Sequence, residues 1–164
     1  MDLELIQSLF LIKLSNLQIY LLFFLLGSFT VATLSDLKHL SAQKEFFQIW
    51  ILFVLVMLGT DIYHHFYVGE NFIYFFIKWG LILLALPLCF HYLGKIAWGD
   101  VWAKMAACSL FSPFLILIFM VLITLINKLT RFIWKIWRKG NYYPFMPVIL
   151  LTTLFLLTIF IFFN

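Results

Sequence analysis

Two aspartates stand where carboxyl chemistry is possible. Asp36 closes a long apolar run, and Asp100 lies between two others. A carboxylate at the end of a membrane helix costs free energy, and such acids are functional by default. Two carboxyl groups brought within a few ångströms share one proton and titrate as a pair. One can take a proton from water while the other donates to a peptide carbonyl oxygen, so the pair predicts peptide-bond hydrolysis.

The elements that must position these aspartates are membrane helices. The chain has 164 residues, of which 65% are hydrophobic, 21% aromatic and 11% charged, and its mean hydropathy is +1.09. About 20 apolar residues cross a bilayer as a helix, which satisfies its own backbone hydrogen bonds. The composition therefore predicts an all-α, polytopic membrane helix bundle. We expect residues 1–164 to form one membrane-embedded domain in contact with the lipid bilayer.

The apolar runs divide into about six spans. Three runs are continuous and cover residues 17–34, 46–60 and 72–92. Residues 101–127 are nearly all apolar, but Ser112 and Pro113 interrupt them, so this segment crosses either once or twice. Two crossings would make the first of the two helices short. A last span covers residues 144–163.

The distribution of Lys and Arg decides between one crossing and two. Lys38 and Lys44 follow the first span, and Lys95 precedes Asp100, which places both aspartates on the cytoplasmic side. Residues 128–139 contain five Lys and Arg residues, and a single crossing would put them outside. We therefore expect two crossings, with both aspartates at the same face of the membrane.

Three segments of the chain resemble the motifs of type IV prepilin peptidases, which are membrane aspartyl proteases related through a Gly-Asp motif to presenilin-type proteases. The segments are VATLSDLKHLSAQKEF, IAWGDVWAKMAACSL and YYPFMPVILLTTL. The motif order, the aspartates at helix ends and their separation fit the family, and the resemblance covers nearly the whole chain. The most persuasive match is a Pro-Phe-x-Pro element, formed by Pro144, Phe145 and Pro147, because in the family it also follows a basic loop.

The resemblance implies that Asp36 and Asp100 are the catalytic pair, that Gly99 lets the backbone approach closely, and that the Pro-Phe-x-Pro element shapes the site. The implied substrate is a prepilin-like protein, a pseudopilin or an archaellin-like protein. Its basic leader is cut just before a hydrophobic helix, at the cytoplasmic face of the cell membrane. No metal or organic cofactor is implied. Longer relatives also methylate the new N-terminus with an extra domain, and we expect peptidase activity only here.

The sequence departs from the family pattern near both aspartates. Ala97 replaces the first glycine of Gly-x-Gly-Asp. Trp102 stands where the family often has a lysine, and Lys104 lies further on. The usual Ile-Pro-Asn is absent, with Gln43 near its place. These departures bear on the choice of substrate, since both carboxyl groups are kept.

Other interpretations of the aspartates remain open. Asp36 could be a solvated acid at a helix end beside Lys38. Asp100 could cap the N-terminus of the following helix, which is compatible with catalysis. For the whole chain, the alternative is a noncatalytic membrane subunit of a pilus or secretion assembly. The oligomeric state is not determined by the sequence.

Two further clusters have a simpler explanation than a binding site. Asp61, His64, His65 and Glu70 could ligate a metal, but we expect residues 61–71 to form a polar interfacial loop on the outer face. The basic residues 128–139 are interleaved with tryptophans, which is typical of a segment at the lipid headgroups and not of a nucleic-acid interface.

Overall fold

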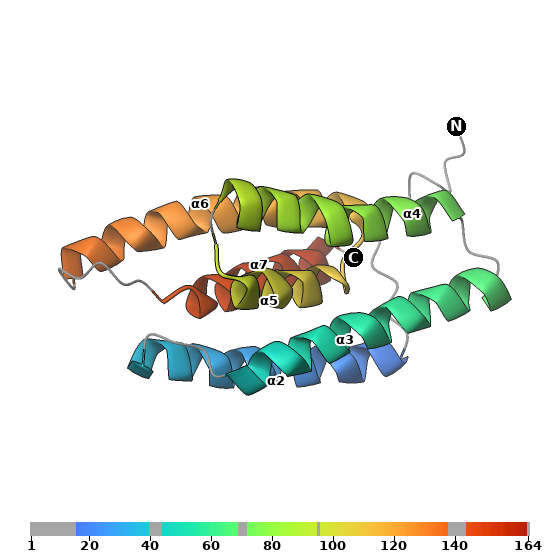
Figure 1. The fold of residues 1–164 in the computed structure, drawn as a ribbon, viewed down its shortest axis with the longest axis horizontal. Coiled ribbons are helices and arrows are strands. Elements are labelled where there is room, and N and C mark those ends of the chain that lie inside the picture. The colour runs from blue at the N-terminus through green and yellow to red at the C-terminus, as the bar shows by residue number, and fades with distance from the viewer. Residues whose placement is uncertain (1–15, 40–43, 69–71, 95, 138–143, 164) are drawn as a thin grey trace.

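The chain folds into a bundle of helices (Figure 1). The computed structural model describes residues 16–39, 44–68, 72–94, 96–137 and 144–163, which contain no strand. The all-α class is thus confirmed for this part of the chain. The α-helices are α2 (Asn16–His39), α3 (Lys44–Tyr63), α4 (Phe72–Gly80), α5 (Trp98–Cys108), α6 (Pro113–Trp137) and α7 (Met146–Phe163). Three π-helical turns are η1 (His64–Val68), η2 (Leu81–Ala85) and η3 (Pro87–Leu93).

Four helical stretches are long and apolar enough to cross a membrane. They are Leu17–Lys38, Glu45–Tyr67, Phe72–Leu93 and Pro113–Lys135. Only 22–28% of the most apolar window of each is buried inside the protein, so most of these side chains face outward, as lipid contact requires. Helix α7 contains a shorter apolar stretch, and α5 has 11 residues, about half the length of a span.

The chain reverses direction between α5 and α6, as expected from the interruption at Ser112 and Pro113. The Leu110 and Phe111 amides donate to the Ala107 and Cys108 carbonyls, at 3.3 and 3.0 Å, and close a tight turn. Figure 1 shows which helix ends lie toward the same end of the bundle. They are the start of α5, the end of α6, the end of α2 and the start of α7. We call this the aspartate end.

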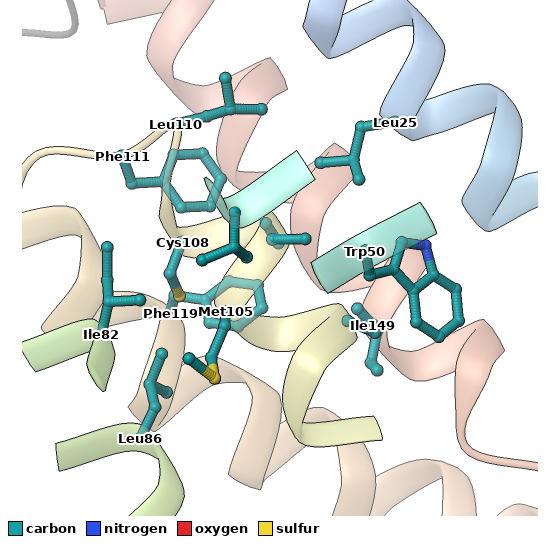
Figure 2. Close-up of a cluster of buried hydrophobic side chains, with 14 of the residues drawn as sticks. Leu25, Trp50, Ile82, Leu86, Met105, Cys108, Leu110, Phe111, Phe119 and Ile149 are labelled. Atoms are coloured by element: carbon teal, nitrogen blue, oxygen red, sulfur yellow. The ribbon is translucent and has the colours of Figure 1, made fainter. Parts of the chain in front are cut away.

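Helix α5 is the central helix of the bundle. Val101 and every residue from Ala103 to Cys108 are buried, and α5 contacts α3, α6, α7, η2 and η3. Its alanines let the neighbouring helices approach closely. Figure 2 shows Met105 and Cys108 of α5 among apolar side chains of the surrounding helices, including Ile82, Leu86 and Phe119. A helix enclosed in this way can hold polar side chains away from lipid.

The third span stays helical across Pro87. Proline has no N–H, and its ring would clash with the carbonyl four residues earlier in a regular α-helix. The backbone instead forms π-helical turns on both sides of Leu86, in η2 and η3. A π-helical turn links residues five apart and accommodates such an interruption. The predicted span at residues 72–92 is therefore present, with a local change of helix type.

Two predicted boundaries are wrong. The first helix continues past Leu34 through Asp36 to His39, so Asp36 lies inside the last turns of α2. The predicted loop at 61–71 is largely helical, since α3 continues to Tyr63 and η1 follows; residues 69–71 lie outside the described part. Both errors have one cause, because polar side chains end a hydrophobic run without interrupting the hydrogen bonds of the helix backbone.

Candidate active site

Asp36 is held in the bundle by a backbone hydrogen bond from a distant helix. Its side chain is 7% exposed, and its Oδ2 accepts the amide N–H of Met146 at 3.0 Å. Met146 is the first residue of α7, so the carboxylate lies at the positive end of that helix dipole. Asp36 is therefore not a solvated helix-end acid.

The Pro-Phe-x-Pro element explains why this amide is available. The Val148 and Ile149 amides both donate to the Phe145 carbonyl, at 3.1 and 3.4 Å, and Pro147 has no N–H. In the first turn of α7 this leaves the Met146 amide as the donor that needs an acceptor from outside the helix. Pro144 is buried immediately before this turn. The three predicted site-shaping residues thus surround the amide that binds Asp36.

Asp100 lies in the first turn of α5. The N-cap residue is Ala97, which is extended (φ −60°, ψ 145°) and whose carbonyl accepts the Val101 amide at 3.2 Å. Asp100 is the third residue of the helix, so the interpretation of Asp100 as the N-cap is wrong. An acid in the first turn is still stabilised by the helix dipole.

A compact turn places Asp100 after the third span. The Gly94 amide donates to the Cys89 carbonyl at 3.1 Å, and the Ile96 amide donates to the Phe90 carbonyl at 3.0 Å. His91 Nδ1 lies 2.9 Å from the Ile96 carbonyl oxygen, with its ring centroid 4.1 Å from that of Trp98. His91 thus fixes the turn that precedes the second aspartate.

The glycine that this turn needs is Gly94 and not Gly99. A Cβ atom at position 94 would lie 2.8 Å from the Phe90 carbonyl oxygen, whereas a Cβ at position 99 would meet nothing within 4 Å. The prediction that Gly99 allows another backbone segment of this protein to approach closely is therefore wrong. A side chain at position 99 would point into open space.

Asp36 of α2 influences the ionisation of Asp100 of α5. Burial raises the pKa of Asp100 to about 6, the Lys104 ammonium opposes this rise, and the Asp36 carboxylate adds to it. Desolvation disfavours the charged carboxyl, and a second carboxylate nearby disfavours it further. The fold thus brings together the two residues that the sequence singled out.

Lys104 is a member of the site whose role the sequence did not reveal. Its side chain is 0% exposed, and its Nζ lies 3.9 Å from the ring centroid of Phe90 and 4.4 Å from that of Phe145. No hydrogen-bond acceptor for Nζ is found in the described part of the chain. The available signal was its position four residues after Asp100, which puts both side chains on one face of a helix.

Thr33 is a second polar group near Asp36 that the sequence did not identify. It is buried three residues before Asp36 on α2, and its hydroxyl has no hydrogen-bond partner within the described ranges. Thr152 and Thr153 of α7, by contrast, donate to carbonyls of their own helix. The Thr33 hydroxyl is therefore free to bind a water molecule or a substrate group.

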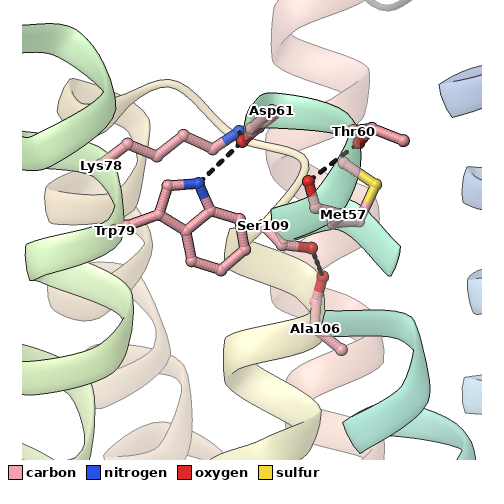
Figure 3. A network of polar contacts seen from close by, with 7 residues as sticks. All are labelled: Met57, Thr60, Asp61, Lys78, Trp79, Ala106 and Ser109. Atoms are coloured by element: carbon pink, nitrogen blue, oxygen red, sulfur yellow. Dashed lines mark hydrogen bonds and ion pairs between the residues drawn. The ribbon is translucent and has the colours of Figure 1, made fainter. Parts of the chain in front are cut away.

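The opposite end of the bundle contains an ion pair. Figure 3 shows Lys78 and Trp79 of α4 directed at Asp61 of α3, and the Asp61 Oδ2 accepts from Lys78 Nζ at 2.7 Å and from Trp79 Nε1 at 3.0 Å. This pairing neutralises a buried lysine inside a span. The described residues hold no group of three His, Cys, Asp or Glu suited to a metal ion, and Glu70 lies outside them.

Comparisons with protein-family models, with curated proteins and with solved structures find no match to this chain.

Proposed function

We propose that this chain is an aspartyl endopeptidase of the cell membrane that removes the leader from prepilin-like proteins at the cytoplasmic face. The observation that carries the proposal is that Asp36 and Asp100 lie toward the same end of the helix bundle, where the Asp36 carboxylate raises the pKa of Asp100. Such coupled carboxyl pairs activate water and protonate carbonyl oxygens in aspartic proteases. The resemblance of the three motifs to prepilin peptidases supplies the substrate class.

The surroundings of the two carboxyl groups suit different roles. Asp36 accepts the Met146 N–H and serves as the base, whereas the burial of Asp100 favours its protonated form, which serves as the acid. Asp36 takes a proton from a water molecule, whose oxygen attacks the peptide carbonyl carbon, while Asp100 donates its proton to the carbonyl oxygen. The tetrahedral intermediate then collapses, and the C–N bond breaks. Asp36 returns its proton to the leaving amine, and Asp100 recovers its own from the hydroxyl group.

The open space beside Gly99 supports this proposal. An extended peptide must pass close to both carboxyl groups, and a residue without a side chain in the first turn of α5 leaves room for its backbone. The Thr33 hydroxyl, one turn before Asp36, is a group that can hold the attacking water.

A processing assay in membranes tests the proposal. A panel of tagged prepilins is co-expressed with the wild-type chain, with Asp36→Asn and with Asp100→Asn, and cleavage is read as a mobility shift and located by N-terminal sequencing. We expect cleavage by the wild type and none by either variant. The matched control combines Asp61→Asn with Lys78→Met, because this removes a carboxylate at the other end of the bundle without leaving Lys78 buried and unpaired, and it should still cleave.

The noncatalytic alternative predicts a different outcome. A membrane subunit that only supports assembly would leave every prepilin uncut in cells with well-expressed wild-type protein, and its deletion would abolish assembly. That result would overturn the peptidase proposal.

A further inference from the structure

Lys104 is a buried lysine without the hydrogen-bonded partner, among the described residues, that a buried ammonium group normally has. Burial lowers its pKa to about 7, and the Asp100 carboxylate opposes this shift. An ammonium group away from water is unfavourable unless it is paired and hydrogen-bonded. Lys78 meets this requirement through Asp61 at 2.7 Å, whereas Lys104 is in contact with two aromatic ring faces and has no hydrogen-bond acceptor within the described ranges. A methionine would fill the same space between the rings without this cost. The positive charge itself therefore requires an explanation.

The charges that act on this group belong to the candidate active site. On α5, Lys104 interacts electrostatically with Asp100, one turn earlier, and with the Cys108 thiol, one turn later. Asp100 in turn interacts with Asp36 of α2. The cation is thus placed beside the aspartate pair within the buried part of the bundle.

Among the described residues, the other elements packed on α5 place no further buried charge beside Lys104. Helix α7 contributes the Phe145 ring, and η3 contributes Phe90, while His91 is directed at the Ile96 carbonyl and the Trp98 ring. The described charged side chains of α3 and α6 at the aspartate end are exposed, and η2 has no titratable residue. Those exposed residues are Glu45, Lys128, Arg131 and Lys135.

The charge of Lys104 defines its role. The Lys104 ammonium favours the ionised Asp100 carboxyl and so opposes the effect of burial on it. Without Lys104, the ionised Asp100 would have no opposite charge beside it on α5, and Asp100 would hold its proton more tightly.

We infer that Lys104 is a positioning residue of the candidate site, whose buried ammonium group is the counter-ion of the Asp100 carboxylate one turn earlier on α5 and sets the pH range over which Asp100 holds its proton. The catalytic consequence rests on the proposed peptidase function, because only the singly protonated pair offers both a base and an acid. The electrostatic statement concerns the protein alone and is measurable without a substrate.

The test is an infrared pH titration of the protonated carboxyl band in the purified full-length chain, in lipid nanodiscs. Asp100→Asn identifies the contribution of Asp100 to this band. In Lys104→Met, we expect the Asp100 midpoint to rise by about one pH unit or more, a tenfold or larger change in proton affinity. Lys104→Arg keeps the charge and should stay near the wild type. Lys78→Met, which removes the buried lysine at the other end, should leave the Asp100 midpoint unchanged.

A cleavage assay across pH gives the second readout. Removal of the positive charge raises the proton affinity of the Asp100 carboxyl, so the limb of the pH profile that Asp100 sets should move to higher pH in Lys104→Met. Lys104→Gln serves as a second neutral variant if the methionine variant does not fold. An unshifted midpoint in a folded neutral variant would overturn the inference. If the wild type cleaves no prepilin, the proposed function fails, and the infrared titration still decides the role of Lys104.

Discussion

The protonation of Asp100 connects the chemistry of the site to the stability of the protein. Burial in the first turn of α5 raises the pKa of this carboxyl to about 6, and Asp36 adds to the rise against the opposing effect of Lys104. The same desolvation that makes Asp100 a suitable acid therefore makes its ionised form unfavourable in the folded state. A residue selected only for stability would not carry this charge.

This residue gives a pH-dependent prediction for stability. The folded state binds the Asp100 proton more tightly than the unfolded state, whose pKa is near the ordinary value of 3.8. The folded state therefore loses roughly 2 kcal/mol of stability as the pH rises from about 4 to about 6.

Asp100→Asn does not titrate, so it should unfold at a higher temperature than the wild type at neutral pH, but at a similar temperature near pH 4. Thermal unfolding in detergent at both pH values measures the difference, and a variant that is less stable at neutral pH would contradict it.

Residue types allowed part of the site to be predicted. Asp36 and Asp100 were recognisable because ionisable groups are rare in apolar segments. In the sequence, Lys104 stands out only as a lysine beyond Trp102, because its ring contacts depend on Phe90 and Phe145, which come from other segments. Such contacts arise only when the helices pack, so no local pattern revealed them.

At the scale of the elements, three short structures position the pair. The start of α7 offers the Met146 amide to Asp36, the turn after η3 sets the start of α5, and α5 itself keeps Asp100 and Lys104 on one face. None of these is a long span. The long helices surround these short elements, and the short elements orient Asp36, Asp100 and Lys104.

The turn after η3 makes the element-scale prediction. Gly94→Ala places a Cβ 2.8 Å from the Phe90 carbonyl oxygen and 3.2 Å from that of Cys89, and backbone atoms cannot move away easily. We expect a loss of roughly 1–3 kcal/mol of stability and reduced cleavage, because the turn carries Asp100.

Gly80→Ala is the matched control for this variant. It lies in the same span, and a Cβ there meets nothing within 4 Å. Alanine favours a helix over glycine by roughly 0.5–1 kcal/mol, so this variant should be as stable as the wild type or more so. Equal unfolding temperatures for the two alanine variants would show that the turn does not need glycine.

Element boundaries were less predictable than element positions. The apolar runs located the spans, because hydropathy reports which residues can face lipid. The continuation of α2 through Asp36 was missed, because Ser35 and Asp36 end the apolar run without ending the backbone hydrogen bonds of the helix. The π-helical turns around Pro87 were missed because they change the backbone hydrogen bonds while the sequence stays apolar. Hydropathy does not detect such a change.

At the scale of the whole molecule, the reversal between α5 and α6 determines which ends share a face. It brings the basic end of α6 to the same end of the bundle as both aspartates, in agreement with the distribution of Lys and Arg (Figure 1). Lys95 and residues 138–139 lie outside the described part of the chain, so their positions stay predictions.

Membrane topology provides the corresponding prediction. Single cysteines are introduced at Lys44, Lys139 and Gly69 in a chain without the two native cysteines, and are labelled with an impermeant reagent from either side. Positions 44 and 139 should react only from the cytoplasm, and position 69 only from outside. Labelling of position 139 from outside would mean that α5 and α6 together cross only once.

If Asp36 and Asp100 form one catalytic unit, as we propose, cleavage kinetics in reconstituted liposomes should reveal it. The rates of Asp36→Asn, Asp100→Asn and the double variant are compared on one prepilin that the wild type cuts, with the combined Asp61→Asn and Lys78→Met variant as the control. Residues that act as a unit are not additive, so each single variant should be as inactive as the double variant. Near-normal turnover by either single variant would contradict the account.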